Sequence, residues 1–190
     1  MEKLLENIIS KFAILPLSSF QKITSIIAYK KVEKGEYLSR KGDLNNHEYF
    51  MLNGICQNYV TNPDGEPVTL SFYMSESVIG PHTTRIKDGR SMVNLKAISD
   101  LTIGLIEAPL FEQLMVEDLS IRNFGNAVLR EELREKVEKE IGLASLPAKE
   151  RLAILRQKYP GIENHVPHTD IASYLGITNI SLSRLRKERS

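Results

Sequence analysis

Hydrophobic residues recur every three or four positions at both ends of the chain and alternate with polar residues in the middle. Residues 1–29 show the helical spacing with a break at Pro16, which predicts two short amphipathic helices. From about residue 31, valine and aromatic residues alternate with polar ones, and turn formers such as Asn53-Gly54 follow every few residues. This spacing is typical of an antiparallel sandwich or barrel, which we place at about residues 30–108. The clearest hairpin turns at residues 62–65, Asn-Pro-Asp-Gly.

Helical periodicity returns after Pro109 and continues to about Ala144, which predicts one long helix over about residues 110–144. Two apolar rows run along it. One row should pack on the β domain and the other on a second copy of the chain, as in a two-stranded dimer seam. The alternative is a helix that lies wholly against its own subunit. The first row comprises Ile121, Phe124 and Val128, and the second comprises Leu129, Leu133, Val137 and Ile141.

The C-terminal part predicts further short helices. Leu146-Pro147 marks a linker, and an amphipathic helix follows over residues 148–159, ended by Pro160-Gly161. Its inward side chains are expected to be Leu152, Ile154 and Leu155.

Residues 168–187 predict two helices joined by a tight turn. In the first helix Ile171, Ala172 and Leu175 share an apolar face, and Gly176 stands where a left-handed C-cap residue is needed. Thr178 is suited to cap the second helix. A small residue such as Ala172 allows two helices to cross closely, as helix-turn-helix units require.

The second of these helices has an outward face of mixed chemistry. At 100° per residue from Leu182 and Leu185, the outward residues are Ile180, Ser183, Arg184 and Lys187, with Asn179 at the flank. Arginine can pair with guanine, asparagine with adenine, and lysine with a phosphate. The alternative is an ordinary helical hairpin with a solvated basic face.

Composition and charge agree with a soluble nucleic-acid-binding protein. The 190 residues are 42% hydrophobic and 26% charged, without an apolar run long enough for a membrane helix, so we expect a cytoplasmic protein without a membrane partner. Residues 146–190 hold eight Lys/Arg against four Asp/Glu, whereas residues 1–145 hold seventeen against twenty. The basic surplus therefore lies in the helix-turn-helix part. The single cysteine, Cys56, allows neither an internal disulfide nor an iron–sulfur cluster.

This order of helices, β domain, long helix and helix-turn-helix resembles the Crp/Fnr family of bacterial transcription regulators over nearly the whole chain. Residues 168–187 follow the family pattern without a gap, and the glycines Gly35, Gly42 and Gly54 look like those of its cyclic-nucleotide-binding barrel. The form of residues 146–187 is similar to regulators common in Bacteroidetes-type bacteria.

The resemblance implies an α+β fold with two domains. Residues 1–145 would form an antiparallel β jelly roll with flanking helices, a sensor domain that includes the dimerisation helix at about 110–144. Residues 146–190 would form an all-α helix-turn-helix domain. The implied partners are double-stranded DNA and a second copy of the chain, and RNA polymerase is a further candidate.

The family's base-reading positions fall on Asn179, Ile180 and Arg184. Family members often carry an acidic or polar residue where Ile180 stands, and an apolar side chain there can read only a thymine methyl group. Backbone contacts are expected from Ser181, Ser183, Arg186 and Lys187. Most family members continue beyond this helix into a β-hairpin wing, whereas this sequence stops at Ser190, so we expect DNA affinity to depend more on the dimer and on these side chains.

The family's ligand pocket is altered in this sequence. Cyclic-nucleotide binders carry a Gly-Glu-Leu turn, but here Pro81 and His82 follow Gly80. The Arg-Ser pair of those binders has a counterpart in Arg90-Ser91, but Arg90 falls about one residue earlier than the family's arginine. A shift of one residue along a strand turns a side chain to the other face of the sheet. We therefore expect no cofactor and an effector other than cyclic AMP. Candidate residues for another small molecule are Gly80, His82, Arg85, Arg90 and Ser91, and the alternative is a loop without a ligand.

Two other function classes compete with DNA binding. A cupin-like metal enzyme needs several converging histidines, which His47 and His82 do not provide, so we predict no catalytic or metal-binding residues and no enzyme. A jelly-roll module that binds a ligand or protein, with weak or lost DNA binding, is the second alternative.

Overall fold

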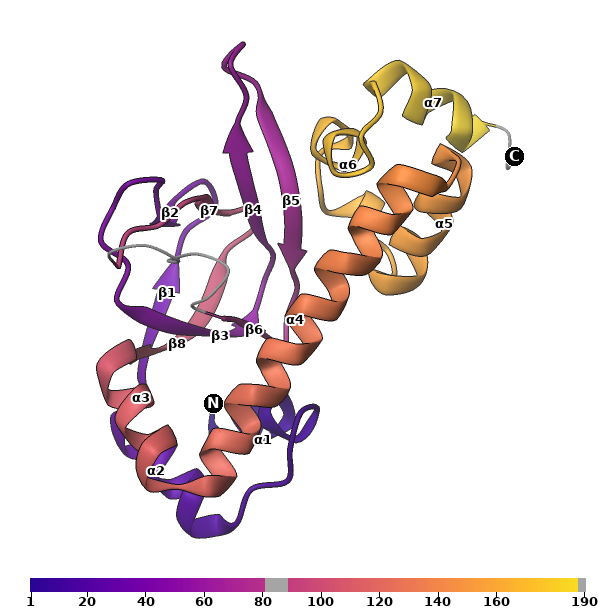
Figure 1. Ribbon diagram of the computed structural model, residues 1–190. Helices are drawn as coiled ribbons and strands as arrows, with labels where there is room; N and C mark the ends of the chain where they lie inside the picture. Colours follow the sequence, from indigo (N-terminus) through magenta and orange to yellow (C-terminus); the bar gives the residue numbers. More distant parts are fainter. Residues whose placement is uncertain (81–88, 188–190) are drawn as a thin grey trace.

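The computed structural model describes residues 1–80 and 89–187. It contains two antiparallel β-sheets with helices at their base, and a long helix, α4, that leads from this base to a group of short C-terminal helices (Figure 1). Sheet A has the strand order β1-β8-β3-β6 and comprises β1 (Ala28–Val32), β8 (Leu101–Glu107), β3 (His47–Asn53) and β6 (Ser77–Ile79). Sheet B has the order β2-β7-β4-β5 and comprises β2 (Tyr37–Ser39), β7 (Asn94–Ala97), β4 (Cys56–Thr61) and β5 (Pro67–Tyr73).

Strand β3 has two buried faces because successive side chains point to opposite sides of a sheet. Tyr49 and Met51 pack between the two sheets with residues such as Leu95, whereas Phe50 and Leu52 pack against the helices. The space between the sheets is therefore filled by side chains, as in a jelly roll. Cys56 lies in this interior, and its complete burial raises the pKa of the thiol.

The predicted hairpin is confirmed as β4–β5. The N–H of Asn62 donates to the carbonyl of Glu66 at 3.0 Å, and the Asn62 side-chain oxygen accepts from the N–H groups of Asp64 and Glu66. Asparagine stabilises turns through such side-chain bonds to its own backbone.

The helices at the base are α1 (Glu2–Ser10), α2 (Leu17–Ile26), α3 (Ala108–Glu117) and the first half of α4 (Leu119–Ser145). The two N-terminal helices and the break between them were predicted correctly. Together these helices bury one face of sheet A, in a core that includes Ile8, Ile23, Phe111 and Phe124.

The single helix predicted over residues 110–144 is wrong, because the chain leaves helical geometry at Asp118. Asp118 has φ −133° and ψ 110°, and its side chain accepts hydrogen bonds from the N–H groups of Ser120 and Ile121. An aspartate that satisfies free N–H groups in this way begins a new helix. Lys22 and Ser19 of α2 also bind this carboxylate, and these contacts hold the pKa of Asp118 at about 2, with Lys22 the largest cause.

The C-terminal helices are α5 (Ala148–Lys158), the 3-10 turn η2 (Ile162–Asn164), α6 (His168–Tyr174) and α7 (Asn179–Lys187). Leu152 and Leu155 of α5 are buried as predicted. Ile154 is 50% exposed, so its predicted inward position is wrong. Ile154 follows Leu152 by two positions and therefore lies about 200° around the helix from that buried side chain.

These helices pack on the edge strand of sheet B, where α6 lies beside β5 (Figure 1). The Tyr159 hydroxyl donates to the carbonyl of Phe72 at 3.1 Å, and the Phe72 and Tyr174 rings are 5.5 Å apart. The Ser173 hydroxyl accepts from the N–H of Thr69 at 2.9 Å and donates to the carbonyl of Pro67. Ser173 thus satisfies backbone groups that an edge strand leaves free.

Candidate nucleic-acid interface and ligand sites

The turn between α6 and α7 has the geometry expected of a helix-turn-helix unit. Gly176 adopts φ +65°, the left-handed conformation that suits glycine at the end of a helix. The N–H of Ile177 donates to the carbonyl of Ala172 at 3.0 Å and closes α6. Thr178 then caps α7, since its hydroxyl oxygen accepts from the N–H of Ser181 at 3.1 Å. Both capping roles were predicted from the sequence.

Helix α7 presents one buried and one exposed face. Leu182 is buried, and Leu185 packs at the edge of the same core. Ile180 is 67% exposed. The residues exposed on this helix are Asn179, Ile180, Ser183, Arg184, Arg186 and Lys187. Within the described part of the chain Arg184 and Lys187 form no hydrogen bond or ion pair, so both cations are available to an external partner.

Two of the predicted backbone-contact residues are engaged inside the protein. The Arg186 guanidinium lies 3.1 Å from a carboxylate oxygen of Glu163 and 2.8 Å from Nε2 of His168. The Ser181 hydroxyl lies 2.9 Å from that of Thr178 and is half-buried. These two side chains hold α7 in place, which leaves Ser183 and Lys187 as the freer candidates for phosphate contacts.

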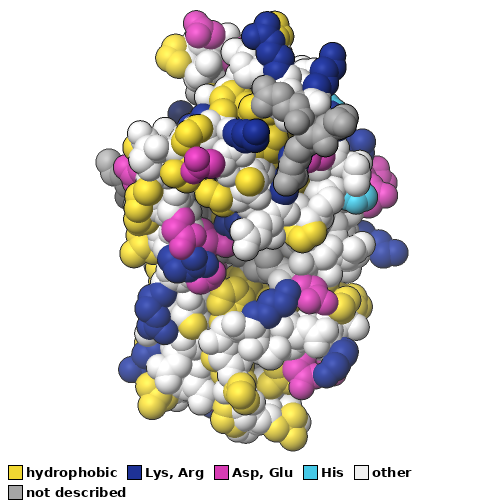
Figure 2. All heavy atoms as spheres, turned by 90° about the vertical axis from the view of Figure 1, so that its right-hand side faces the viewer, with side chains coloured by type: hydrophobic (Ala, Val, Ile, Leu, Met, Phe, Trp, Pro, Cys, Tyr) yellow, Lys and Arg dark blue, Asp and Glu magenta, His cyan; other side chains and the backbone are white. Residues whose placement is uncertain are grey.

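The basic surplus of the C-terminal part does not form a continuous patch on the face shown in Figure 2, where Lys and Arg side chains are interspersed with Asp, Glu and hydrophobic ones. Ion pairs account for part of this mixing. Arg156 and Arg186 share Glu163, and Lys158 pairs with Glu135 of α4 at 2.8 Å. Arg156, and to a smaller extent Arg186, lowers the pKa of Glu163.

Three of the four residues of the predicted second apolar row are exposed on α4, whereas the fourth, Leu129, is half-buried and lines the cavity beside sheet A. Leu133 is 64% exposed, Val137 44% and Ile141 56%. Three large apolar side chains at this spacing on one helix form the surface that we predicted to meet a second copy.

The residues predicted to hold a small molecule make contacts with different elements. The N–H of Gly80 donates to Glu132 of α4 at 3.1 Å. Arg90 donates to the carbonyl of Gly42 at 2.8 Å, and the buried Ser91 hydroxyl donates to the carbonyl of Val93 at 2.7 Å. His82 and Arg85 lie outside the described residues.

A groove of about 590 Å³ lies between β4–β5 and the C-terminal half of α4. Asn58, Tyr73, Lys136 and Lys139 are among the residues that line it. The side-chain oxygen of Asn58 is buried and has no hydrogen-bond partner among the described residues.

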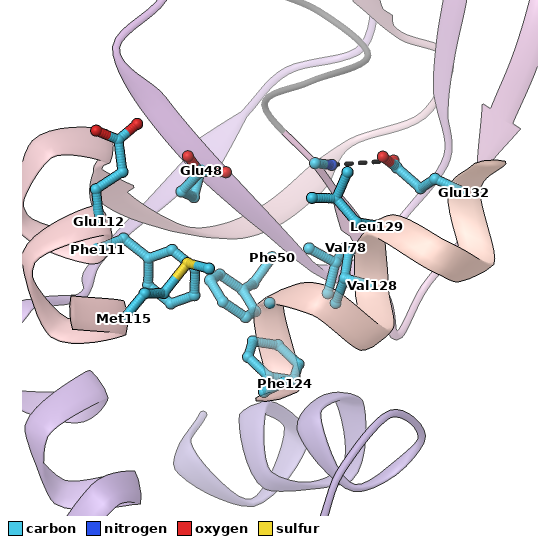
Figure 3. A pocket seen from close by; sticks show the side chains of 12 residues that line it. Glu48, Phe50, Val78, Phe111, Glu112, Met115, Phe124, Val128, Leu129 and Glu132 are labelled. Carbon is cyan, nitrogen blue, oxygen red and sulfur yellow. Dashed lines mark hydrogen bonds between the residues drawn. The ribbon is translucent and has the colours of Figure 1, made fainter. Parts of the chain in front are cut away.

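A separate cavity of about 240 Å³ lies between sheet A and the hairpin of α3 and α4 (Figure 3). Aromatic and aliphatic side chains form its floor, and carboxylates lie around its upper edge in this view. Its lining includes Glu48 and Phe50 of β3, Val78 of β6 and the following Gly80, Phe111, Glu112 and Met115 of α3, and Phe124, Gly125, Val128, Leu129 and Glu132 of α4.

The sequence interpretation did not single out Glu132 or Lys139 of the long helix. Burial raises the pKa of Glu132 to about 7, although the hydrogen bond from Gly80 acts to lower it. Burial also lowers the pKa of Lys139 to about 8. A signal was present in the sequence. Glu132 and Lys139 continue the buried row of Phe124 and Val128 at helical spacing, so their positions face the β-sheets.

In residues 1–80 and 89–187, no three His, Cys, Asp or Glu side chains gather in a way that could hold a metal ion. Over the same residues, no helix is both long and apolar enough to cross a lipid bilayer.

Comparison with known proteins finds a matching domain family for part of the chain and similar folds for most of it. Residues 29–118, from β1 to the end of α3, match the family of the cyclic nucleotide-binding domain. A solved protein from Eubacterium rectale, assigned to the Crp/Fnr family of transcriptional regulators, is similar with a TM-score of 0.69 and 16% identity, over 92% of this chain and 83% of that one. The fold is that of the Crp/Fnr regulators.

Two further solved structures are similar over most of this chain. FixK2 from Bradyrhizobium japonicum has a TM-score of 0.75 and 20% identity, over 86% of this chain and 84% of that one. The c-di-GMP-responsive global regulator CLP of Xanthomonas campestris has a TM-score of 0.72 and 16% identity, over 91% of each chain. No curated protein matches the sequence. The narrower resemblance to Bacteroidetes-type regulators stays a prediction.

Proposed function

We propose that this protein is a sequence-specific DNA-binding transcription regulator of the Crp/Fnr type that acts in the cytoplasm as a homodimer. The observation that carries the proposal is the exposed face of α7, where Asn179, Ile180 and Arg184 project outward while Leu182 anchors the helix. An α-helix of this kind fits the major groove of B-DNA, in which every base pair presents a distinct pattern of donors and acceptors.

The proposed roles of the side chains follow from their chemistry. Arg184 would pair with a guanine, Asn179 with an adenine or a phosphate, and Ile180 with a thymine methyl group. Lys187 and Ser183 would bind the DNA backbone. Two α7 helices of a dimer would meet half-sites about one helical turn, roughly 34 Å, apart on a pseudo-palindromic operator.

The proposed dimer would form along α4, whose apolar row of Leu133, Val137 and Ile141 is exposed in the single chain. Burying these side chains removes apolar surface from water, which favours association. The domain division fits this scheme, with residues 1–145 as the sensor part and residues 146–190 as the DNA-binding part. RNA polymerase is a further partner that the family resemblance suggests.

We propose that the effector is not cyclic AMP. The support is that Arg90 and the Ser91 hydroxyl already bind carbonyls of the protein and that no glutamate follows Gly80. A cyclic phosphate would have to compete with these internal hydrogen bonds. An effector would act by binding more tightly to the dimer geometry that matches the operator.

The test is selection of preferred sequences from a pool of random DNA duplexes, with the full chain alone, with cyclic AMP and with cell extract. We expect an enriched pseudo-palindromic motif that does not depend on cyclic AMP. Enrichment only with cyclic AMP would overturn the effector proposal alone. No enriched motif under any condition would overturn the regulator proposal and favour a ligand- or protein-binding module.

A further inference from the structure

A groove of about 290 Å³ lies where the chain passes from α4 into α5, between the last turns of α4, α5 and the end of α6 (Figure 1). Among the described residues its lining comes from helices alone, whereas strands form one wall of the groove beside β4–β5. Leu143 is 44% exposed and Ile154 50%, so apolar surface of two helices is open to solvent here. The apolar part of the lining comprises Gly142, Leu143, Leu146, Ile154, Leu155 and Leu175.

The hollow depends on a glycine inside α4. A Cβ atom on Gly142 would meet a side-chain carbon of Leu146 at 3.8 Å, which is an ordinary contact distance. The surroundings therefore accept a side chain at this position, although glycine weakens a helix relative to alanine. The missing side chain, and no steric requirement of the backbone, keeps the groove open.

Most charged groups of the lining are already held by the protein. Glu135 pairs with Lys158 at 2.8 Å, and Glu138 pairs with Arg134. The Lys139 ammonium donates to two backbone carbonyls of β5, at 2.6 and 3.1 Å. The two carboxylates of the lining are thus neutralised by cations of the same chain.

Arg151 differs from these groups, because it lines the groove without an anionic partner. Its guanidinium donates to the carbonyl of Leu146 at 2.7 Å, and within residues 1–80 and 89–187 it forms no ion pair. A guanidinium has five N–H donors in a planar fork that matches a carboxylate. The groove therefore combines an apolar trough with one cation that has no anion beside it.

We propose that this groove is a binding site for a linear aliphatic carboxylate of about eight carbon atoms. Apolar cavities of roughly 150 Å³ bind benzene, so a groove of about 290 Å³ has room for a chain of about eight carbons. The carboxylate would pair with Arg151, and the chain would lie over Gly142 against Leu143 and Ile154.

The bound chain would also touch the support of the helix-turn-helix turn. A Cβ atom on Gly176 would meet the Leu143 side chain at 3.1 Å, so Leu143 lies directly beside this turn. A ligand against Leu143 would therefore contact the side chain on which the turn rests. The inference goes beyond DNA binding and does not depend on it.

The test is calorimetric titration of the full chain with octanoate, hexanoate and octylamine. Octanoate and octylamine share one chain length and differ in charge, and we expect one octanoate per chain with at least roughly tenfold tighter binding than octylamine. Each CH₂ group removed should weaken binding by about fourfold, so hexanoate should bind at least roughly tenfold more weakly than octanoate.

Three results would contradict the proposal. Equal or tighter binding of octylamine would overturn the selectivity for a carboxylate. Equal binding of hexanoate and octanoate would show that the chain does not lie in the apolar trough. Absence of saturable octanoate binding would overturn the site itself.

A pair of variants locates the ligand. Gly142→Leu fills the groove from a position at which the structure accepts a Cβ atom, so octanoate binding should fall by at least roughly tenfold. Ala144→Leu adds similar apolar bulk at an exposed position of the same helix outside the groove and should leave octanoate binding unchanged. Equal octanoate affinity in both variants would place the ligand elsewhere and overturn the proposal.

A third variant keeps the test decisive if Gly142→Leu does not fold. Arg151→Gln should weaken octanoate by roughly tenfold and leave the affinity for 1-octanol, which has no charge, unchanged. Arg130→Gln, at an exposed position of α4 outside the groove, is the control and should alter neither affinity. An unchanged ratio of octanoate to 1-octanol affinity in Arg151→Gln would overturn the proposed carboxylate site.

Discussion

The Glu132 carboxylate accepts a hydrogen bond from the backbone N–H of Gly80 at 3.1 Å, and this contact joins the middle of α4 to the end of β6. A Cβ atom on Gly80 would lie only 2.6 Å from the carboxylate, so a side chain at this position would displace the Glu132 side chain. Burial at this contact raises the pKa of Glu132 to about 7.

This pKa predicts a pH dependence of stability. An unfolded Glu132 would titrate near 4.5 and the folded one near 7, so between these values the folded state holds the proton more tightly. Stability should therefore fall as pH rises from about 4.5 to about 7 and stay level above it. Glu132→Gln keeps an oxygen that accepts from the N–H of Gly80 but removes the buried charge. At pH 8 the free energy of unfolding of this variant should therefore exceed that of the parent protein by about 1–3 kcal/mol.

Urea denaturation of the parent and of Glu132→Gln at pH 8, 6 and 4.5 would measure this difference, which should shrink as pH falls. Glu140→Gln, at an exposed position of the same helix, is the matched control and should show no such trend. A gain for Glu132→Gln that is the same at all three pH values would contradict the titration of Glu132.

The contact between Ser173 and strand β5 predicts a specific loss of stability. Thr69 is 1% exposed, and its N–H has the Ser173 hydroxyl as acceptor. Ser173→Ala leaves this N–H buried without a partner, which should lower the free energy of unfolding by about 1–3 kcal/mol. Ser183→Ala is the control. It removes a serine hydroxyl from the exposed face of α7 and should change the free energy of unfolding by less than about 0.5 kcal/mol. Equal effects of the two substitutions in urea denaturation would refute the edge-strand role.

Arg184 and Lys187 of α7 should affect DNA binding differently. Arg184→Ala should weaken binding to the preferred operator by about 1–3 kcal/mol and relax the preference at one base pair, with little effect on binding to random DNA. Lys187→Ala should weaken binding to all DNA sequences alike and reduce the salt dependence of binding. Titration of selected and random duplexes at several salt concentrations separates these outcomes. Equal losses on both kinds of DNA for Arg184→Ala would remove its base-reading role.

The exposed row on α4 predicts the basis of self-association. Leu133→Glu combined with Val137→Glu places two charges on the proposed seam, so sedimentation analysis should detect monomers at concentrations at which the parent is dimeric. Val116→Glu is the control, because Val116 is 74% exposed on α3, away from the row. A parent chain that sediments as a monomer, or a double variant that remains a dimer, would contradict the seam.

Local patterns in the sequence were sufficient to predict the DNA-facing part. Leu182 and Leu185 define the inward face of a regular helix, so helix geometry alone places Ile180 and Arg184 outside. Gly176 and Thr178 act within one turn of their own position, and such local interactions are readable from neighbouring residues. The hairpin at residues 62–65 was predicted for the same reason.

Long-range contacts account for what the sequence did not reveal. The break at Asp118 is fixed partly by Ser19 and Lys22, almost one hundred positions earlier in the chain. The contacts of Ser173 with β5 and of Glu132 with Gly80 likewise join residues that are distant in sequence. The cavity was not predictable because it is a space between four elements, and its volume depends on how closely they pack.

The burial of Cys56 between the two sheets gives the protein an internal reporter of its own opening. Cys56 is the single cysteine of the sequence and has no exposed surface, and only the thiolate reacts readily with alkylating agents. Alkylation of the native protein must therefore wait until the sheets separate. Its rate at increasing urea concentrations would follow the separation of the sheets without any added label or engineered residue.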